Sequence, residues 1–174
     1  MPRAFRKVKD GFPQSASETA LTAQALRKHR MAVLALADET VLEAEAARLS
    51  GSFSYTFLRR PEAGLVMLEG RAGNTGQRFN LGEMLVTRCV VLLDPQGNGA
   101  ATEGYAFIQG NHPRHAELAA LFDALLQQEV WTESITRSLI EPLAARRAAR
   151  LRQRAAETAA TKVDFFTLVR GEDA

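Results

Sequence analysis

The stretch Arg71-Ala-Gly-Asn-Thr-Gly-Gln-Arg-Phe-Asn-Leu-Gly82 lies between two apolar runs in the middle of the chain. It carries three glycines and two arginines. Glycine adopts backbone conformations closed to other residues and lets a ligand approach closely, while arginine offers a planar charged fork for phosphate, phosphonate or carboxylate. The stretch therefore predicts either an anion cradle or a wide connection between strands. It lacks the Gly-Lys-Ser/Thr ending of a Walker-type phosphate loop, so an independent NTPase is not expected.

Short strands are expected on both sides of this loop. Residues from Phe53 to Phe57 alternate between apolar and polar, and Arg60-Pro-Glu-Ala-Gly64 is typical of a turn, so the first two strands should form a β-hairpin. A second turn signal, from Asp94 to Gly99, separates the last two strands. The expected strands cover residues 53–57, 65–70, 84–93 and 104–108.

Helices are expected towards both ends of the chain. Ser15-Ala-Ser-Glu18 matches a capping box, and Asn111 can cap a helix that opens at Pro113. Pro142 should interrupt one helix and open the next. The expected helices cover residues 15–36, about 40–51, 112–125, 131–140 and 142–159. Together these elements predict an α+β fold, with a small and mostly antiparallel sheet flanked by N-terminal and C-terminal helices.

Composition sets the broad class of the protein. The 174 residues are 46% hydrophobic and 24% charged, which is typical of a globular protein. Residues 1–14 are expected to form a mobile basic leader, and residues 15–174 a single domain. No apolar run approaches the roughly 20 residues that cross a bilayer. With a single cysteine, Cys89, no internal disulfide can form, and we expect a cytoplasmic protein.

The sequence offers no self-sufficient catalytic or metal-binding group. His112 and His115 lack a third ligand nearby, whereas zinc sites need three or four, so no metal is expected and His115 should lie on a helix surface. His115 and Glu117 could still form a polar pair that contacts a neighbour. Cys89 lies in an apolar strand and should act as a small hydrophobic residue. The catalytic residues, if any, remain unknown.

A basic helix near the end of the chain is open to two interpretations. Arg146, Arg150 and Arg154 share one helix face at a spacing of four residues. This face could be solvated or protein-facing, or it could make the chain a stand-alone module that binds nucleic acid or another polyanion. A net charge of only +2 argues against nucleic acid.

The apolar segment Val163-Asp-Phe-Phe-Thr-Leu-Val-Arg-Gly171 is unusual near a terminus, because termini are usually polar and frayed. It could close this chain's own sheet. Alternatively it could be buried against another subunit, for example as a strand added to a neighbour's sheet edge.

Several of these segments resemble one known family. The resemblance rests on Arg71 to Glu83 followed by Thr87-Arg88, and on the ending Phe165-Phe-Thr-Leu-Val-Arg-Gly171. Further matching blocks are Gly104-Tyr105, Gln109-Gly110, His115-Ala-Glu117 and Asp123-Ala-Leu125. The sequence is similar, over most of its length after about residue 26, to the PhnG family of the bacterial carbon–phosphorus lyase system.

The resemblance implies an accessory subunit of a transferase complex. In such a complex methylphosphonate displaces adenine from ATP at the ribose C1 position, giving α-D-ribose 1-methylphosphonate 5-triphosphate. The implied partners are PhnH, PhnI and PhnJ-like subunits and a PhnL-like ATPase, with the chemistry mainly in a partner. ATP would be a substrate of the complex, and no cofactor is expected on this chain alone. No membrane association is implied.

The residues expected to contact an anion or a partner come mainly from the Gly/Arg stretch. They are Arg71, Gly73, Thr75, Gly76, Arg78, Arg88, His115 and Glu117. The residues expected at a partner interface in the terminal segment are Phe165, Phe166 and Arg170.

Overall fold

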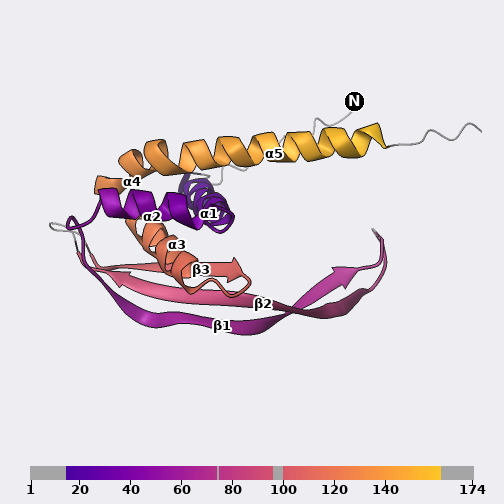
Figure 1. Cartoon of the computed structure of the whole chain (residues 1–174), viewed down its shortest axis with the longest axis horizontal. Coiled ribbons are helices and arrows are strands. Elements are labelled where there is room, and N and C mark those ends of the chain that lie inside the picture. Colours follow the sequence, from indigo (N-terminus) through magenta and orange to yellow (C-terminus); the bar gives the residue numbers. More distant parts are fainter. Residues whose placement is uncertain (1–14, 74, 96–99, 162–174) are drawn as a thin grey trace, which may run out of the picture.

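The computed structural model describes residues 15–73, 75–95 and 100–161, with the side chains described from residue 23 onwards. It is an α+β structure in which helices lie on one side of an antiparallel sheet (Figure 1), as the sequence predicts. The elements are α1 (Ser15–Leu34), α2 (Glu39–Arg48), β1 (Tyr55–Arg71), β2 (Arg78–Leu93), β3 (Thr102–Gln109), α3 (Pro113–Leu125), α4 (Glu129–Ile135), the π-helical turn η1 (Thr136–Ile140) and α5 (Glu141–Ala160).

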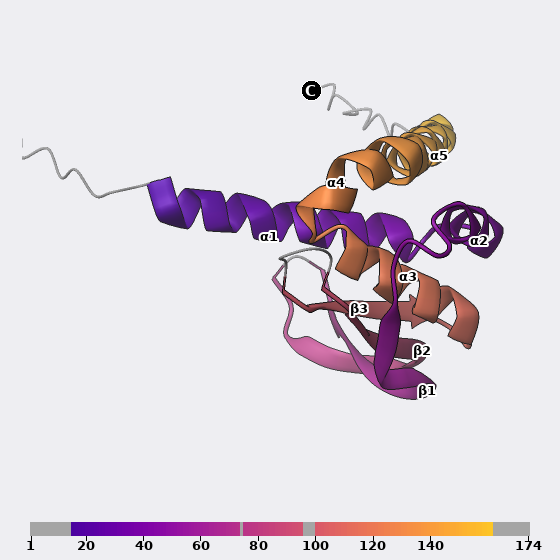
Figure 2. The same ribbon diagram turned by 90° about the vertical axis from the view of Figure 1, so that its left-hand side faces the viewer.

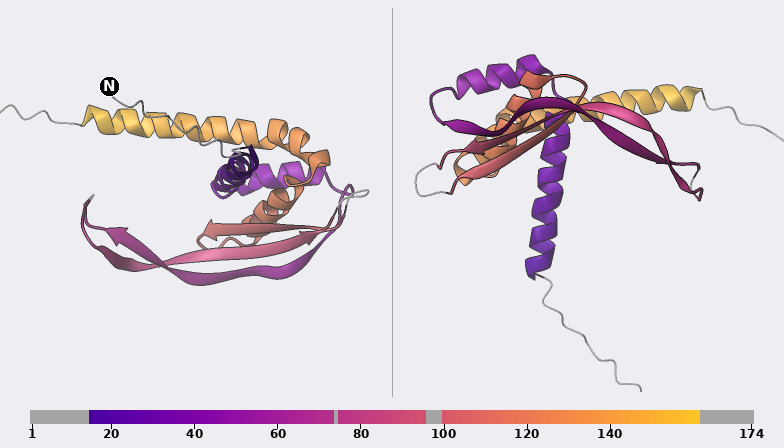
Figure 3. Two further views of the ribbon diagram at one scale, coloured as in Figure 1. Left: turned by 180° about the vertical axis from the view of Figure 1, so that it is seen from behind. Right: turned by 90° about the horizontal axis from the view of Figure 1, so that it is seen from below.

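The sheet has three strands in the order β1-β2-β3, and its strands differ greatly in length. β1 and β2 pair from Tyr55–Leu93 to Arg71–Arg78, whereas β3 pairs only with the half of β2 from Val86 to Leu93. Beyond β3 the two long strands continue as a two-stranded ribbon, here called the arm (residues 65–85). Figure 3 shows the arm twisting as it extends beyond the end of β3.

The predicted turn at residues 60–64 is wrong, because this segment lies within the single strand β1. Pro61 cannot donate a ladder hydrogen bond, but β1 is an edge strand, where proline is tolerated. Two register shifts on either side of Arg59 show how the strand absorbs the irregular segment. The expected hairpin of 53–57 with 65–70 is therefore replaced by one longer hairpin of β1 with β2.

The loop between β1 and β2 is shorter than the Gly/Arg stretch that was expected to form it. Only residues 72–77 link the strands, and Arg78 to Gly82 already belong to β2. Gly73 has a φ of 64°, a conformation that favours glycine. Gly76 donates its backbone N–H to the carbonyl of Ala72 at 3.1 Å, and a Cβ at Gly76 would lie only 2.0 Å from that oxygen. The sequence thus specifies a tight tip for the arm.

The core lies where α3 packs on β2 and β3, away from the arm. In Figure 2, α3 lies against the sheet, α1 and α2 pack on its other side, and α5 lies farther from the sheet, against α1 and η1. The approach is close at Gly104, where a Cβ would lie 2.0 Å from the carbonyl oxygen of Ala120. The largest fully buried side chains of this core are Phe122, Leu34, Leu42, Leu93, Leu118, Leu125, Ile135 and Leu139.

The C-terminal helices run on through the expected break. α4, η1 and α5 follow one another without a gap, and Pro142 is the second residue of α5. Proline lacks the N–H of a normal helical bond, and the π-helical turn directly before it absorbs this irregularity. The third helix begins at Pro113 with His112, not Asn111, as its N-cap residue. The predicted leader (1–14) and the terminal segment (163–171) lie outside the described residues.

One buried carboxylate ties three elements together. Asp123 on α3 is 2% exposed. It accepts hydrogen bonds from Arg27 of α1 at 3.1 and 2.7 Å, and from the backbone N–H of Tyr105 on β3 at 3.0 Å. The Arg27 guanidinium also lies over the Tyr105 ring, 5.7 Å from its centroid. The pKa of Arg27 is raised, chiefly by the hydrogen bond to Asp123.

Replacing Asp123 by asparagine should lower the free energy of unfolding by about 2–4 kcal/mol, because charge-assisted bonds to Arg27 and Tyr105 are lost at a buried site. Chemical denaturation measures the change. The matched control is Glu133→Gln, which removes a carboxylate from the fully exposed pair with Arg137 and should cost under about 0.5 kcal/mol. Equal stabilities of the two variants would show that Asp123 does not hold these elements together.

Candidate functional site

The arm exposes an unusual amount of apolar side chain. Four consecutive residues, Leu65 to Leu68, are 38–63% exposed. Since successive residues of a strand point to opposite faces, both faces of the ribbon are apolar. The exposed apolar residues of the arm are Leu65, Val66, Met67, Leu68, Phe79, Leu81 and Leu85. Contiguous apolar patches of this kind mark interaction sites.

The backbone of the arm is also open along its edges. β3 ends opposite Val86, and the last bond at this side runs from the Gly110 N–H to the Leu85 carbonyl at 2.8 Å. From Leu85 to Arg78, β2 therefore has no strand of this chain on its second edge within the described residues. A two-stranded hairpin alone is marginally stable in water. An added layer or strand would supply what the arm lacks.

The predicted arginines Arg71 and Arg78 lie directly opposite each other at the tip of the arm. Arg78 forms an exposed ion pair with Glu69 at 3.2 Å. Like charges on opposite cross-strand positions repel, so an anion or a carboxylate placed between them would be favoured. Gly73 and Thr75 are exposed beside them. The Gly/Arg stretch thus forms a projecting tip that carries two cations. Gly76 permits the tight backbone turn there, because a side chain at this position would clash with Ala72.

Arg88 lies apart from the tip, on the three-stranded part of β2. It donates to Glu62 on β1 at 2.7 Å, and the same carboxylate accepts from Arg59 at 2.7 Å. The two guanidiniums, Arg88 first, lower the pKa of Glu62. The structure does not bring Arg88 together with Arg71 and Arg78. Its charge is already shared within an exposed cluster.

His115 is buried, which contradicts the prediction that it lies on a helix surface. It is 7% exposed, and its Nε2 lies 2.9 Å from the carbonyl oxygen of Leu34. A carbonyl only accepts, so Nε2 carries the proton of this hydrogen bond. The bond ties α3 to the end of α1, where Leu34 is the last residue. His112, in contrast, is exposed as expected.

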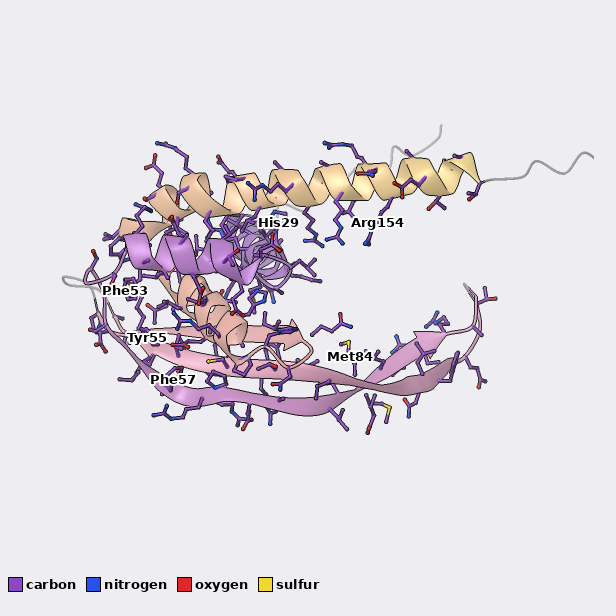
Figure 4. The ribbon with its side chains drawn as sticks, viewed as in Figure 1. His29, Phe53, Tyr55, Phe57, Met84 and Arg154 are labelled. Atoms are coloured by element: carbon purple, nitrogen blue, oxygen red, sulfur yellow. The ribbon has the colours of Figure 1, made fainter. Side chains whose placement is uncertain are left out.

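Glu117 pairs with Tyr55 and Arg114 and not, as the sequence had suggested, with His115. It accepts a hydrogen bond from the Tyr55 hydroxyl at 2.5 Å and forms an ion pair with Arg114 at 3.0 Å. Burial and the Glu117 carboxylate raise the pKa of Tyr55 to about 12. Tyr55 also stacks edge-on with Phe57 at 5.7 Å, in the aromatic series at the start of β1 (Figure 4). Glu117 therefore anchors α3 to β1.

Cys89 is a core residue of β2, as the sequence predicts. It is 1% exposed, and burial raises the pKa of its thiol to about 11. Such a thiol is a poor nucleophile. Over the described residues, the structure shows no group of three or more His, Cys, Asp or Glu that could hold a metal ion. Its described helices include none long and apolar enough to cross a membrane.

The apolar arm is a candidate interaction surface that the sequence did not lead us to expect. The signal was the continuous run Leu65-Val-Met-Leu68, since strands covered on both faces are apolar without alternation. The expected interface residues Phe165, Phe166 and Arg170 lie outside the described residues.

The sequence of this chain is similar to those of known proteins. Residues 25–171 match the family described as phosphonate metabolism protein PhnG. A relative from Rhizobium meliloti (strain 1021), the α-D-ribose 1-methylphosphonate 5-triphosphate synthase subunit PhnG, is 47% identical over 116 residues. The match covers 67% of this chain and 70% of the relative. The resemblance found in the sequence is thereby confirmed, and the chain belongs to the PhnG family of phosphonate metabolism proteins.

Proposed function

We propose that this chain is an accessory subunit of an α-D-ribose 1-methylphosphonate 5-triphosphate synthase complex. In this reaction methylphosphonate displaces adenine from the ribose C1 of ATP, so ATP and methylphosphonate are substrates of the complex. The name of the relative, a subunit of that synthase, supports the assignment. The chemistry would take place mainly in a partner subunit.

The arm is the observation in the structure that carries this proposal. Its apolar residues lie on both faces of a ribbon that the described residues leave uncovered, and β2 offers an open edge beside them. Fully burying one such side chain contributes roughly 1.5–3 kcal/mol. A handful of them would offset the cost of ordering an interface. The alternative, a stand-alone polyanion-binding module that uses α5, would not explain why the arm exposes so many apolar side chains.

The partners in this proposal are PhnH, PhnI and PhnJ-like subunits and a PhnL-like ATPase, assembled in the cytoplasm. The tip of the arm would meet a partner or a bound anion, because Arg71 and Arg78 are exposed opposite each other there and Glu69 pairs with Arg78. Gly73, Thr75 and Gly76 would shape that tip. Arg88, His115 and Glu117 have structural partners within the chain, and we assign them supporting roles.

The isolated chain should release no adenine from ATP in the presence of methylphosphonate, because the proposal locates the reacting groups in another subunit. Chromatographic detection of free adenine makes the measurement. The remaining subunits serve as the control: adenine should appear once this chain is added to them. Adenine release by the chain alone, at the rate of the reconstituted complex, would contradict the accessory role.

Replacing Leu65 and Phe79 together by serine should abolish assembly with the other subunits while leaving the melting temperature of the free chain nearly unchanged. Both side chains are about half exposed or more, at 63% and 48%, so the free chain loses little burial, whereas an interface would lose both contacts. Co-purification and thermal unfolding give the two readouts.

The matched control is Phe107→Ser, which removes an aromatic ring that is 58% exposed on β3, outside the arm. It should leave assembly intact. Normal assembly of the arm variant, or equal loss in the control, would show that the arm is not the contact surface.

A further inference from the structure

A second surface, separate from the arm, lies between the end of α1 and the middle of α5. It is a groove of about 370 Å³. Val33 and Leu143 form its buried floor, and Leu36 and Leu151, which are 68% and 55% exposed, form apolar rims. Its charged lining residues are Asp38, Arg146, Arg147, Arg150 and Arg154.

The charged side chains that line this groove are mostly positive. Four of its lining residues are arginines, and Asp38 is the single carboxylate among them. Over the part of the chain that the structure describes, the salt bridges all involve other residues. Arg146, Arg150 and Arg154 recur every four residues, or about 6 Å along the helix axis. Figure 4 shows Arg154 on the side of α5 that faces the rest of the molecule.

The combination of positive charge and exposed leucines limits the kinds of molecule that could bind in this groove. A free phosphate or nucleic acid would use the arginines but gain nothing from Leu36 and Leu151, and nucleic-acid sites add aromatic or amide readers. An anionic membrane is broad and flat, whereas these arginines line a recess between two helices. An amphipathic helix with acidic residues at a four-residue spacing and apolar residues beside them would satisfy both features.

We propose that this groove docks an acidic amphipathic helix from another subunit of the complex. The proposal rests on the subunit role set out above but uses a different surface from the arm. The acidic residues of that helix would face Arg146, Arg150 and Arg154, and its apolar residues would cover Leu36 and Leu151. The exposed arginines would set orientation and association rate, and the leucines would supply the buried area.

The test measures binding of the full-length chain to the co-purified remaining subunits. Arg150→Glu should weaken binding by roughly tenfold or more, as should Leu151→Ser. Arg152→Glu is the matched control, because it makes the same charge change on the same helix at a residue that does not line the groove. It should change affinity by no more than about twofold. Circular dichroism of each variant checks that α5 stays helical.

Any of the following outcomes would overturn the proposal. One is an equal loss for Arg150→Glu and Arg152→Glu, which would reflect overall charge. Another is full affinity of Leu151→Ser. The third is tight binding of the wild-type chain to tripolyphosphate, duplex DNA or phosphatidylglycerol vesicles that depends on Arg150 but not on Leu151. A chain that binds the remaining subunits through the arm, with the groove variants unaffected, would refute the groove alone. No binding by the wild-type chain would refute the proposed function as well.

Discussion

The mismatch in length between β3 and its neighbour β2 determines the rest of this structure. β3 pairs with β2 only from Val86 onwards, so the sheet is three strands wide over one half and two over the other. α3 can pack only on the wider half, and the core gathers there. Within the described residues, the arm has paired backbone but no covering layer. The core is closed, whereas the apolar arm is exposed. Such a fold suits a subunit whose arm is covered by a partner.

Close packing and a few polar anchors hold the wider half together. The absence of a side chain at Gly104 lets α3 come down on β3 at Ala120. Asp123 then links α3 to β3 and α1, and His115 links it to the end of α1. Because these anchors are buried in or beside the core, the polar residues of α3 are occupied inside the chain. The arm and the groove beside α5 are the two surfaces that we propose for binding.

Sequence patterns predicted the elements better than the tertiary arrangement. The α+β class and a helix over about residues 112–125 are as expected, because local sequence patterns determine them. The turn at residues 60–64 is wrong, because a proline on an edge strand is permitted and only the strand order reveals the edge. His115 is buried through a bond to Leu34, a contact 81 residues away in sequence. For the arm, the two arginines of the tip could be read directly from the sequence. The exposure of Leu65 to Leu68 could not, because it depends on where β3 ends.

The central claim is that the arm is completed by another subunit. Hydrogen exchange followed by mass spectrometry tests it directly, in the free chain and in the assembled complex. In the free chain, the amides of residues 65–71 and 78–85 should exchange much faster than those of residues 87–93, which α3 covers. Assembly should slow exchange in the arm to near the rate of the core. Arm amides that exchange equally fast with and without the partner subunits would contradict the account.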